Sequence, residues 1–357
     1  MILGNGGAAI NAIRSIRGCN DRDEILLISK ENCSAYCPML TPFFLQEKIS
    51  FEDMFLCDAE FYRKSEVHLI LGKEAVGVEP SSREVILEGG NSVPYDTLLI
   101  ATGSSPILPD IEGIRLPHVM GLRTLDDAGK IKGESEKAKD IVFLGGGLVS
   151  LHVLNALYRP DLRFTLVVAS PHVLSLMVDK EGARVIEERL DAFGVRILKR
   201  CEAQRITRES VVLNDGAELC ADLVIVGKGV KPNIGFLKGT EIQVNTGIGV
   251  DGFMRTSVED IFAAGDVTEA KDPISNQWQL NPTWPNAIEQ GKAAGLNMIG
   301  GESRLMRHIR MNVSSLFGLT FASFGYVPGE EERVDVVRRD GPNYRKLIFK
   351  DHLFIGG

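Results

Sequence analysis

Residues 256–267 read Thr256-Ser257-Val258-Glu259-Asp260-Ile261-Phe262-Ala263-Ala264-Gly265-Asp266-Val267 and give the strongest indication of the fold. A short apolar strand runs into small residues and then into a lone carboxylate. Small residues at a strand end let another molecule touch the backbone. The carboxylate of Asp266 can accept hydrogen bonds from ligand hydroxyls. Because the Ala-Gly-Asp triplet also fits a plain turn, two further stretches are needed to decide between these interpretations.

Those two stretches are Ile2-Leu3-Gly4-Asn5-Gly6-Gly7-Ala8-Ala9 and Asp96-Thr97-Leu98-Leu99-Ile100-Ala101-Thr102-Gly103. Together the three stretches resemble the FAD-binding signature of the pyridine nucleotide-disulfide oxidoreductase family. The resemblance extends from Met1 to about Gly329. It implies an α/β fold with two Rossmann-like dinucleotide-binding domains, the second inserted in the first, and a short α+β C-terminal interface domain that is truncated.

Composition limits the class of protein. The chain has 357 residues, of which 44% are apolar and 25% charged, so it should form two or three ordinary globular domains. The net charge of −8 and the lack of a long basic run argue against a nucleic-acid partner. No apolar run is long enough for membrane insertion, and Met1–Ala9 lacks the basic start of a signal peptide. Because the first strand begins almost at residue 1, we expect a few residues to precede it.

The cysteines argue against a metal site. Six are scattered along the chain without a CxxC pair: Cys19, Cys33, Cys37, Cys57, Cys201 and Cys220. We therefore expect no zinc or iron–sulfur site within this chain. Reduced thiols also favour a cytoplasmic location.

The N-terminal glycines predict the first nucleotide site. Gly4-x-Gly6-x-x-Ala9 follows a strand and opens a helix from Gly7 to about Arg17, where backbone N–H groups and the helix dipole favour a pyrophosphate. The following strand, Glu24 to Ile28, should end in an acid that holds the ribose. Here Ser29-Lys30-Glu31 stands instead, so Glu31 is the expected ribose contact, with Ser29 as the alternative.

The resemblance implies further FAD contacts along the chain. Ala75 would meet the adenine through backbone groups, Asp266 would bond the ribityl chain, and the amides that begin a helix at Trp284 would face the flavin pyrimidine. Such a helix start would stabilise the negative charge of reduced flavin. The expected FAD-binding residues are Gly4, Gly6, Gly7, Ala8, Glu31, Ala75, Ala101, Thr102, Gly103, Gly265, Asp266 and Ala287.

Residues 33–45 form the segment in which many family members carry a redox cysteine. An alignment through Tyr36, Leu40 and Pro42 places Met39 where single-cysteine members have theirs, and Cys33 and Cys37 are wrongly spaced for a redox pair. The segment is more similar to the NADH:rubredoxin and nitrite reductase-like branch, although Pro38 replaces an Arg that is frequent there. Cys37 remains a candidate redox thiol, with a buried inert thiol as the alternative.

A second nucleotide site is predicted at Gly145-Gly146-Gly147, between a strand from Asp140 and a helix from Leu148 to Tyr158. The resemblance implies an NAD(P)H domain whose contacts would be Gly145, Gly147, Leu148, Val149 and Gly229. Three residues depart from the family pattern: Ser150 replaces the third small residue, His152 replaces a frequent Glu, and Val168 replaces the ribose-binding acid.

These departures leave two interpretations of the second site. Since no Arg follows Val168 to bind a 2′-phosphate, we expect NADH in preference to NADPH, weakly selected at the ribose. The alternative is a βαβ unit that keeps its structure after losing its ligand. His152 is a candidate for a role near the nicotinamide, or else a helix-face residue without one.

The expected domains are an FAD-binding domain at 1–110 and 248–308, an NAD(P)H-binding domain at 111–247 and a partial interface domain at 309–357. As a hypothesis, the protein passes electrons from NADH through FAD to a redox partner protein or to metal-containing subunits of a larger complex. One alternative is a thiol or disulfide reductase of the coenzyme A disulfide type that uses Cys37. Another is a non-catalytic accessory subunit that holds FAD. The chain would form a homodimer or a hetero-oligomer.

Overall fold

The chain divides into two compact units, each described here by itself. The structure is a computed structural model that describes residues 1–305, 309–325, 334–340 and 343–357. The first unit comprises Met1–Met39, Phe51–Ser105 and Lys231–Arg310, and the second comprises Leu40–Ser50, Pro106–Val230 and Met311–Gly357. The prediction that a second unit is inserted in the first is thereby confirmed. The three-domain division stays a prediction, and its boundary at residue 308 lies outside the described residues.

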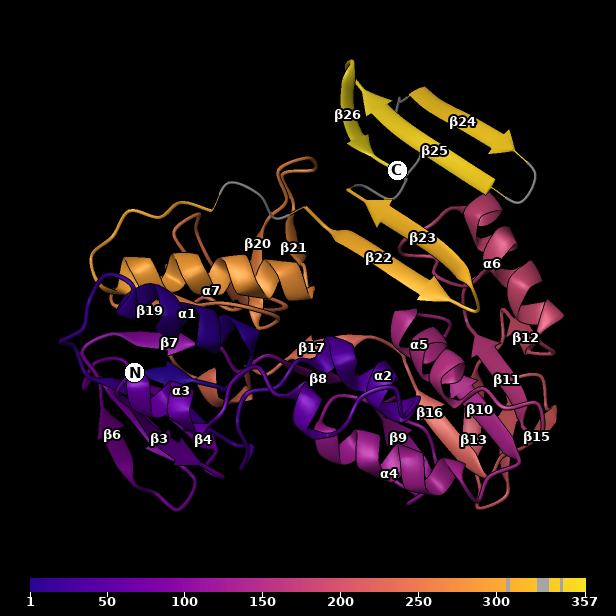
Figure 1. The fold of residues 1–357 in the computed structure, drawn as a ribbon, viewed down its shortest axis with the longest axis horizontal. Coiled ribbons are helices and arrows are strands. Elements are labelled where there is room, and N and C mark those ends of the chain that lie inside the picture. Colours follow the sequence, from indigo (N-terminus) through magenta and orange to yellow (C-terminus); the bar gives the residue numbers. More distant parts are fainter. Residues whose placement is uncertain (306–308, 326–333, 341–342) are drawn as a thin grey trace. The chain divides into compact units, whose positions relative to one another are not determined.

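The first unit is built on a five-stranded parallel sheet in the order β19-β7-β1-β2-β3. Figure 1 labels β19, β7 and β3 of this sheet. Two smaller antiparallel sheets, β4-β5-β6 and β20-β21 with β18 alongside, accompany it. The elements of this unit are β1 (Ile2–Leu3), α1 (Gly7–Arg17), β2 (Ile25–Ser29), η2 (Glu52–Met54), α3 (Ala59–Lys64), β3 (Val67–Leu71), β4 (Ala75–Glu79), β5 (Glu84–Leu87), β6 (Ser92–Pro94), β7 (Leu98–Ile100), η3 (Gly235–Leu237), β18 (Ile248–Gly249), β19 (Ile261–Ala263), β20 (Thr268–Lys271), β21 (Trp278–Leu280) and α7 (Trp284–Met298).

The second unit repeats the design with a five-stranded parallel sheet in the order β12-β11-β10-β16-β9. Its elements are α2 (Thr41–Leu45), β9 (Val119–Gly121), α4 (Leu125–Ser135), β10 (Asp140–Leu144), α5 (Leu148–Leu157), β11 (Arg163–Val168), α6 (Lys180–Ala192), β12 (Arg196–Lys199), β13 (Ala203–Ile206), β14 (Ser210–Leu213), β15 (Glu218–Cys220), β16 (Leu223–Val226), β22 (Met311–Leu316), β23 (Leu319–Phe324), β24 (Val334–Asp340), β25 (Asn343–Lys350) and β26 (Leu353–Gly356). Three short elements lie where the chain passes between units: η1 (Pro38–Leu40), β8 (Ser104–Pro106) and β17 (Val230–Pro232).

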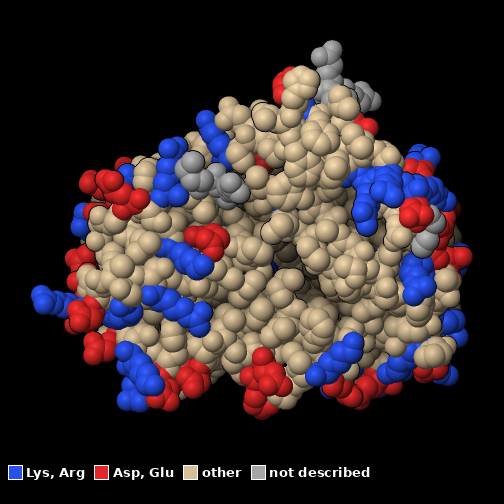
Figure 2. Space-filling model, turned by 45° about the horizontal axis from the view of Figure 1, so that its top comes forward, with Lys and Arg blue, Asp and Glu red and all other residues tan. Residues whose placement is uncertain are grey.

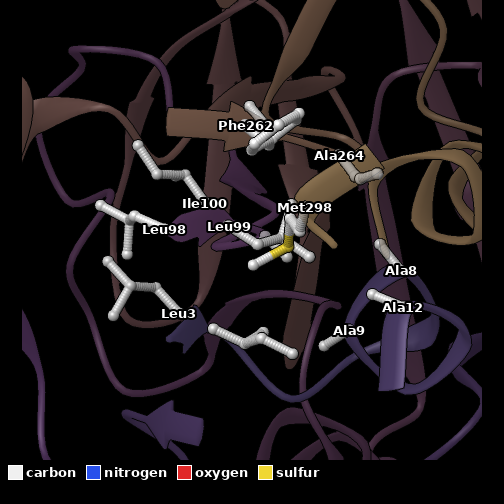
Figure 3. Close-up of a cluster of buried hydrophobic side chains, with 14 of the residues drawn as sticks. Leu3, Ala8, Ala9, Ala12, Leu98, Leu99, Ile100, Phe262, Ala264 and Met298 are labelled. Carbon is white, nitrogen blue, oxygen red and sulfur yellow. The ribbon is translucent and has the colours of Figure 1, made fainter. Parts of the chain in front are cut away.

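The core of the first unit explains why its central strands carry almost only apolar residues. Strands of a parallel sheet are buried on both faces, so they show continuous apolar runs rather than alternation. Leu98, Leu99 and Ile100 of β7 are fully buried. Figure 3 shows Leu99 next to Met298, whereas Leu98 and Ile100 lie on the side away from the small residues of α1.

Helices α1 and α7 lie side by side in this unit because α7 carries glycines at the contact (Figure 1). A Cβ built at Gly291 would lie 2.2 Å from the carbonyl oxygen of Ala8, and one at Gly295 would lie 2.5 Å from that of Ala12. No real Cβ comes so close to a backbone oxygen, so the two helices depend on both glycines for their close approach.

The C-terminal strands belong to the second unit and pack on its helices. The turn between β22 and β23 is held by a hydrogen bond from the Phe317 N–H to the Asn155 side chain (2.8 Å) and by one from the Arg189 Nε to the Phe317 carbonyl (2.7 Å). The Phe317 ring contacts the rings of Tyr158 and Phe193. These contacts tie β22 and β23 to α5 and α6.

The sheet β24-β25-β26 is attached to the start of α6. Asp179 caps α6 by accepting a hydrogen bond from the Gly182 N–H (2.9 Å). The same carboxylate accepts a hydrogen bond from the Tyr344 hydroxyl (2.7 Å) and pairs with the Lys346 Nζ (3.0 Å). One carboxylate thus joins a helix start to a strand far along the sequence.

In the part of the chain that the structure describes, the helices are too short or too polar to cross a bilayer. On the face drawn in Figure 2, basic and acidic side chains lie next to one another.

Candidate cofactor sites

The turn between β1 and α1 brings the first predicted glycines together with the end of β7. Gly4 has a φ of +102°, and a Cβ there would lie 2.2 Å from the carbonyl oxygen of Ala101. A Cβ at Gly6, in contrast, would have no atom within 4 Å. Gly4 is therefore required by strand packing, whereas Gly6 leaves an open space where a ligand can approach the backbone.

The N-terminus of α1 is suited to an anion. Among the described residues no side chain caps it, and its first turn contains no acid. The first N–H groups of a helix point outwards and carry partial positive charge, which favours a phosphate. The Trp284 ring covers Gly7, since a Cβ there would lie 2.7 Å from two ring carbons. Trp284 therefore packs on the first residue of α1, and a side chain at position 7 would displace it.

The Ala-Gly-Asp turn after β19 is held by a residue that the sequence analysis did not identify. Gln290 is 1% exposed, and its Oε1 accepts hydrogen bonds from the Gly265 N–H (2.6 Å) and the Thr268 hydroxyl (3.0 Å). The single hydrogen of the Thr268 hydroxyl is shared between Gln290 Oε1 and the Gly265 carbonyl, which lies 2.8 Å from the hydroxyl oxygen. Gln290 lies on α7, one turn after Ala287, so α7 fixes the backbone that presents Asp266. No local pattern marks this glutamine, because its partners lie more than 20 residues away.

Asp266 and the turn after β7 come together in the first unit. The Ser104 hydroxyl donates a hydrogen bond to Asp266 Oδ2 at 3.1 Å. Gly103 has a φ of +67°, a conformation that glycine adopts readily. Asp266, Thr102 and Gly103 thus lie on adjoining turns, and their contact with FAD stays a prediction.

The expected ribose and adenine contacts, Glu31 and Ala75, are more accessible to solvent than Gln290. Glu31 is exposed, and its carboxylate accepts a hydrogen bond from the Tyr36 hydroxyl (2.8 Å). Ser29, the alternative, is 6% exposed at the end of β2. Ala75 is the first residue of β4 and is half-buried. Because only Glu31 presents an accessible carboxylate, we keep it as the expected ribose contact.

The second unit repeats the first glycine arrangement. Gly145 has a φ of +120°, and a Cβ there would lie 2.3 Å from the carbonyl oxygen of Gly227, at the end of the neighbouring strand β16. At Gly147 the nearest atom would be an ordinary 3.8 Å away. As in the first unit, Gly145 is required for close packing against the neighbouring strand, whereas Gly147 leaves space for a ligand to approach the backbone. Among the described residues no side chain caps α5, so its N-terminus can also receive an anion.

The remaining predicted contacts of the second site lie on the first turn of α5 and after β16. Val149 is 41% exposed on the first turn of α5, next to Leu148, and Gly229 has a φ of +93°. Val168 is 2% exposed, and its side chain comes within 3.0 Å of a Cβ built at Gly146. An apolar side chain thus fills the position where the family has a ribose-binding acid.

The two weak catalytic candidates are engaged elsewhere. His152 Nε2 lies 2.8 Å from the Ser314 hydroxyl of β22, and burial lowers the pKa of this histidine. Cys37 is 9% exposed, and its N–H bonds the carbonyl of Met54 (2.8 Å). Met39, in contrast, is 52% exposed. A thiol is therefore buried, and a thioether stands in the accessible position.

A scan against protein-family models matches residues 1–291 to the family described as pyridine nucleotide-disulphide oxidoreductase. The chain belongs to this family. The family membership makes the protein an oxidoreductase and implies FAD and NADH as its cofactors. The glycine turns at Gly4 and Gly145, each with an open position after it and an uncapped helix, fit two such dinucleotides.

Other members of the family support this assignment over nearly the whole chain. The NADH-dependent phenylglyoxylate dehydrogenase subunit epsilon of Aromatoleum evansii is 31% identical, with 98% of this chain and 85% of that protein covered. The NADH-rubredoxin oxidoreductase of Clostridium acetobutylicum is 28% identical over 91% of this chain and 81% of that protein. Among solved structures, an NAD-dependent persulfide reductase from A. fulgidus matches with a TM-score of 0.93 and 25% identity, covering 99% of this chain and 72% of that chain.

Proposed function

We propose that the protein is an FAD-dependent electron-transfer subunit that passes electrons from NADH to a protein or redox-centre acceptor in a larger iron–sulfur or metal enzyme complex. The observation that carries the proposal is the pair of side chains in the segment where a redox cysteine would lie. Cys37 is 9% exposed, whereas Met39 is 52% exposed. A thioether cannot form the thiolate that disulfide exchange requires. Electrons would therefore leave the flavin without passing through a protein thiol.

The names of two relatives support this choice. One is named as a subunit of an NADH-dependent dehydrogenase and another as an oxidoreductase that acts on rubredoxin. Both names include NADH; one describes a subunit of a larger enzyme and the other names rubredoxin as the redox partner. Applied to this chain, they favour a partner protein or partner subunit as the acceptor.

The chain would hold and tune the cofactor as follows. Gly6 and the start of α1 would bind the pyrophosphate, and Asp266 would bond the ribityl hydroxyls. Bound FAD would supply the exchange between two-electron and one-electron chemistry. The start of α7 lacks a side-chain cap among the described residues and contains no acid in its first turn, so its dipole would favour negative charge on the reduced flavin.

At the second site the chain would bind NADH through the glycine turn and the start of α5. Val168 offers no carboxylate to the ribose, so selection of NADH over NADPH would be weak. The same residue supports the alternative of an FAD-holding accessory subunit whose second site no longer binds a nucleotide. The two possibilities differ in whether the purified protein, without partner subunits, binds NADH.

The proposal is tested by the choice of acceptor in anaerobic assays with NADH. We expect turnover with ferricyanide or a small iron–sulfur protein, little or none with coenzyme A disulfide, and no change in Cys37→Ser or Met39→Ala. Cys220→Ser, at an exposed position, is the matched control. If Cys37→Ser abolished turnover while Cys220→Ser did not, the protein would be a thiol or disulfide reductase. If none of the acceptors supported turnover and the protein did not bind NADH, the protein would be the accessory subunit.

A further inference from the structure

Asn233 lies at the point where the chain returns to the first unit, which resumes at Lys231. Its side chain reaches a turn that is distant in sequence. The Asn233 Nδ2 donates a hydrogen bond to the Thr102 carbonyl (2.8 Å), and its Oδ1 accepts one from the Ser105 hydroxyl (2.7 Å). Both ends of the amide are thus used on one turn.

The backbone of Asn233 is bound to the same turn. Its N–H donates to the Gly103 carbonyl (2.9 Å), and its carbonyl accepts a hydrogen bond from the Thr102 hydroxyl (3.0 Å). The preceding residue, Pro232, is buried, and its ring fixes φ at about −65° just before Asn233. Four hydrogen bonds from one residue therefore hold residues 102–105.

This turn carries two expected FAD contacts and leads to a third. Thr102 and Gly103 are predicted to lie beside the pyrophosphate, and the neighbouring Ser104 bonds Asp266. Asn233 thus holds Thr102, Gly103 and Ser105, and Ser104, which lies between them in the chain, bonds the carboxylate expected at the ribityl chain. All of these residues belong to the first unit.

We propose that Asn233 is a positioning residue for the flavin: it fixes the turn at residues 102–105 and, through Ser104, the orientation of Asp266. The proposal rests on the function proposed above for these FAD contacts. Asparagine is suited to the role because its amide both donates and accepts. Aspartate would keep the acceptor for Ser105 but would place a carboxylate oxygen against the Thr102 carbonyl, where two acceptors repel. Alanine would leave both partners unbonded.

The test measures FAD binding to the apoprotein, by quenching of FAD fluorescence, and the midpoint potential of the bound flavin. We expect Asn233→Asp and Asn233→Ala to weaken FAD binding by about tenfold or more, which corresponds to about 1.4 kcal/mol. We also expect a shifted midpoint potential, which a purely structural role would not produce. Asn245→Asp, at an exposed position of the same unit, should change neither quantity.

Ser105→Ala is a milder variant for the case in which the Asn233 variants fail to fold. It removes a single hydrogen bond, so a smaller loss of FAD affinity in the same direction is expected. Unchanged FAD affinity and potential in Asn233→Asp, or in Ser105→Ala if Asn233→Asp does not fold, would overturn the proposal. Failure of NADH to reduce the wild-type flavin would instead refute the proposed function and leave the FAD-binding result interpretable.

Discussion

The Oγ of Ser150 occupies the space that a side chain at Gly227 would need: a Cβ built at Gly227 would lie 2.1 Å from it. In the first unit the corresponding positions are Ala9 and Ala101, two small residues that both carry a Cβ. Relative to the first unit, the second unit thus has a larger residue on the helix (Ser150 in place of Ala9) and a smaller one after the strand (Gly227 in place of Ala101). This pairing explains why Ser150 can depart from the family pattern without disturbing the glycine turn.

Gly227→Ala should destabilise the second unit by roughly 1–3 kcal/mol, because the new methyl group meets Ser150 in a closely packed site. Ser150→Ala should be neutral or stabilising, since the buried Ser150 hydroxyl has no hydrogen-bond partner among the described residues. The double variant should then recover most of the loss. Thermal unfolding of the three variants forms a double-mutant cycle. Additive effects would show that the two positions do not share the space.

Gly291→Ala tests the contact between α7 and α1. Alanine usually stabilises a helix interior by about 0.5–1 kcal/mol over glycine. Here the added methyl group would meet the Ala8 backbone carbonyl, which cannot rotate away, so we expect a net loss of roughly 1–3 kcal/mol. FAD binding should weaken as well, because α1 carries the expected pyrophosphate site.

The matched control is Gly129→Ala in α4, where a Cβ would have no atom within 4 Å. It should raise the unfolding temperature, as expected for an unhindered helix position. If Gly291→Ala also raised it and left FAD affinity unchanged, the close approach of α7 to α1 would not depend on glycine.

The sequence predicted the repeated strand–turn–helix units well because their signals are local. The helix at Gly7–Arg17 has the predicted bounds, and the helix predicted to begin at Leu148 begins there and ends at Leu157. The hydrogen-bonding roles of Gln290 and Asn233 could not be predicted in this way, since their partners lie between 22 and 131 positions away. The short helix α3 was also missed, because its six residues offer too little periodicity.

His152 should make the stability of the second unit depend on pH. Burial lowers the pKa of His152 below its ordinary value of about 6.5, so the unfolded chain binds the proton more readily than the folded one. The unfolding free energy should be highest above pH 6.5 and fall as the pH drops from there towards the lowered pKa. His152→Gln should remove this part of the pH dependence in chemical denaturation. His68→Gln, at an exposed position, should retain it; identical profiles for both variants would contradict the assignment.

Asp179 should control how the sheet β24-β25-β26 is attached to α6. Burial alone would raise the pKa of Asp179, but hydrogen bonds from Gly182, Tyr344 and Lys346 lower it overall. The charged carboxylate therefore stabilises the fold at neutral pH, and this contribution should be lost as the pH falls through the lowered pKa.

Asp179→Ala should accordingly cost about 1–2 kcal/mol at pH 7, the usual loss for a removed helix cap. The amides of β25 should then exchange with deuterium faster than in the wild type. Asp161→Ala, which removes an exposed carboxylate of the same unit, should leave exchange in β25 unchanged. Equal protection of β25 in both variants would show that Asp179 does not attach the sheet.

The central claim is that electrons pass from NADH through FAD to the acceptor without a protein thiol. An anaerobic titration of the purified protein with NADH, monitored by the absorbance of the flavin, tests this claim most directly. The account predicts that one equivalent of NADH per FAD bleaches the flavin completely, and that Cys37→Ser gives the same end point. A flavin that stays oxidised, or a wild type that consumes two equivalents where Cys37→Ser consumes one, would contradict it.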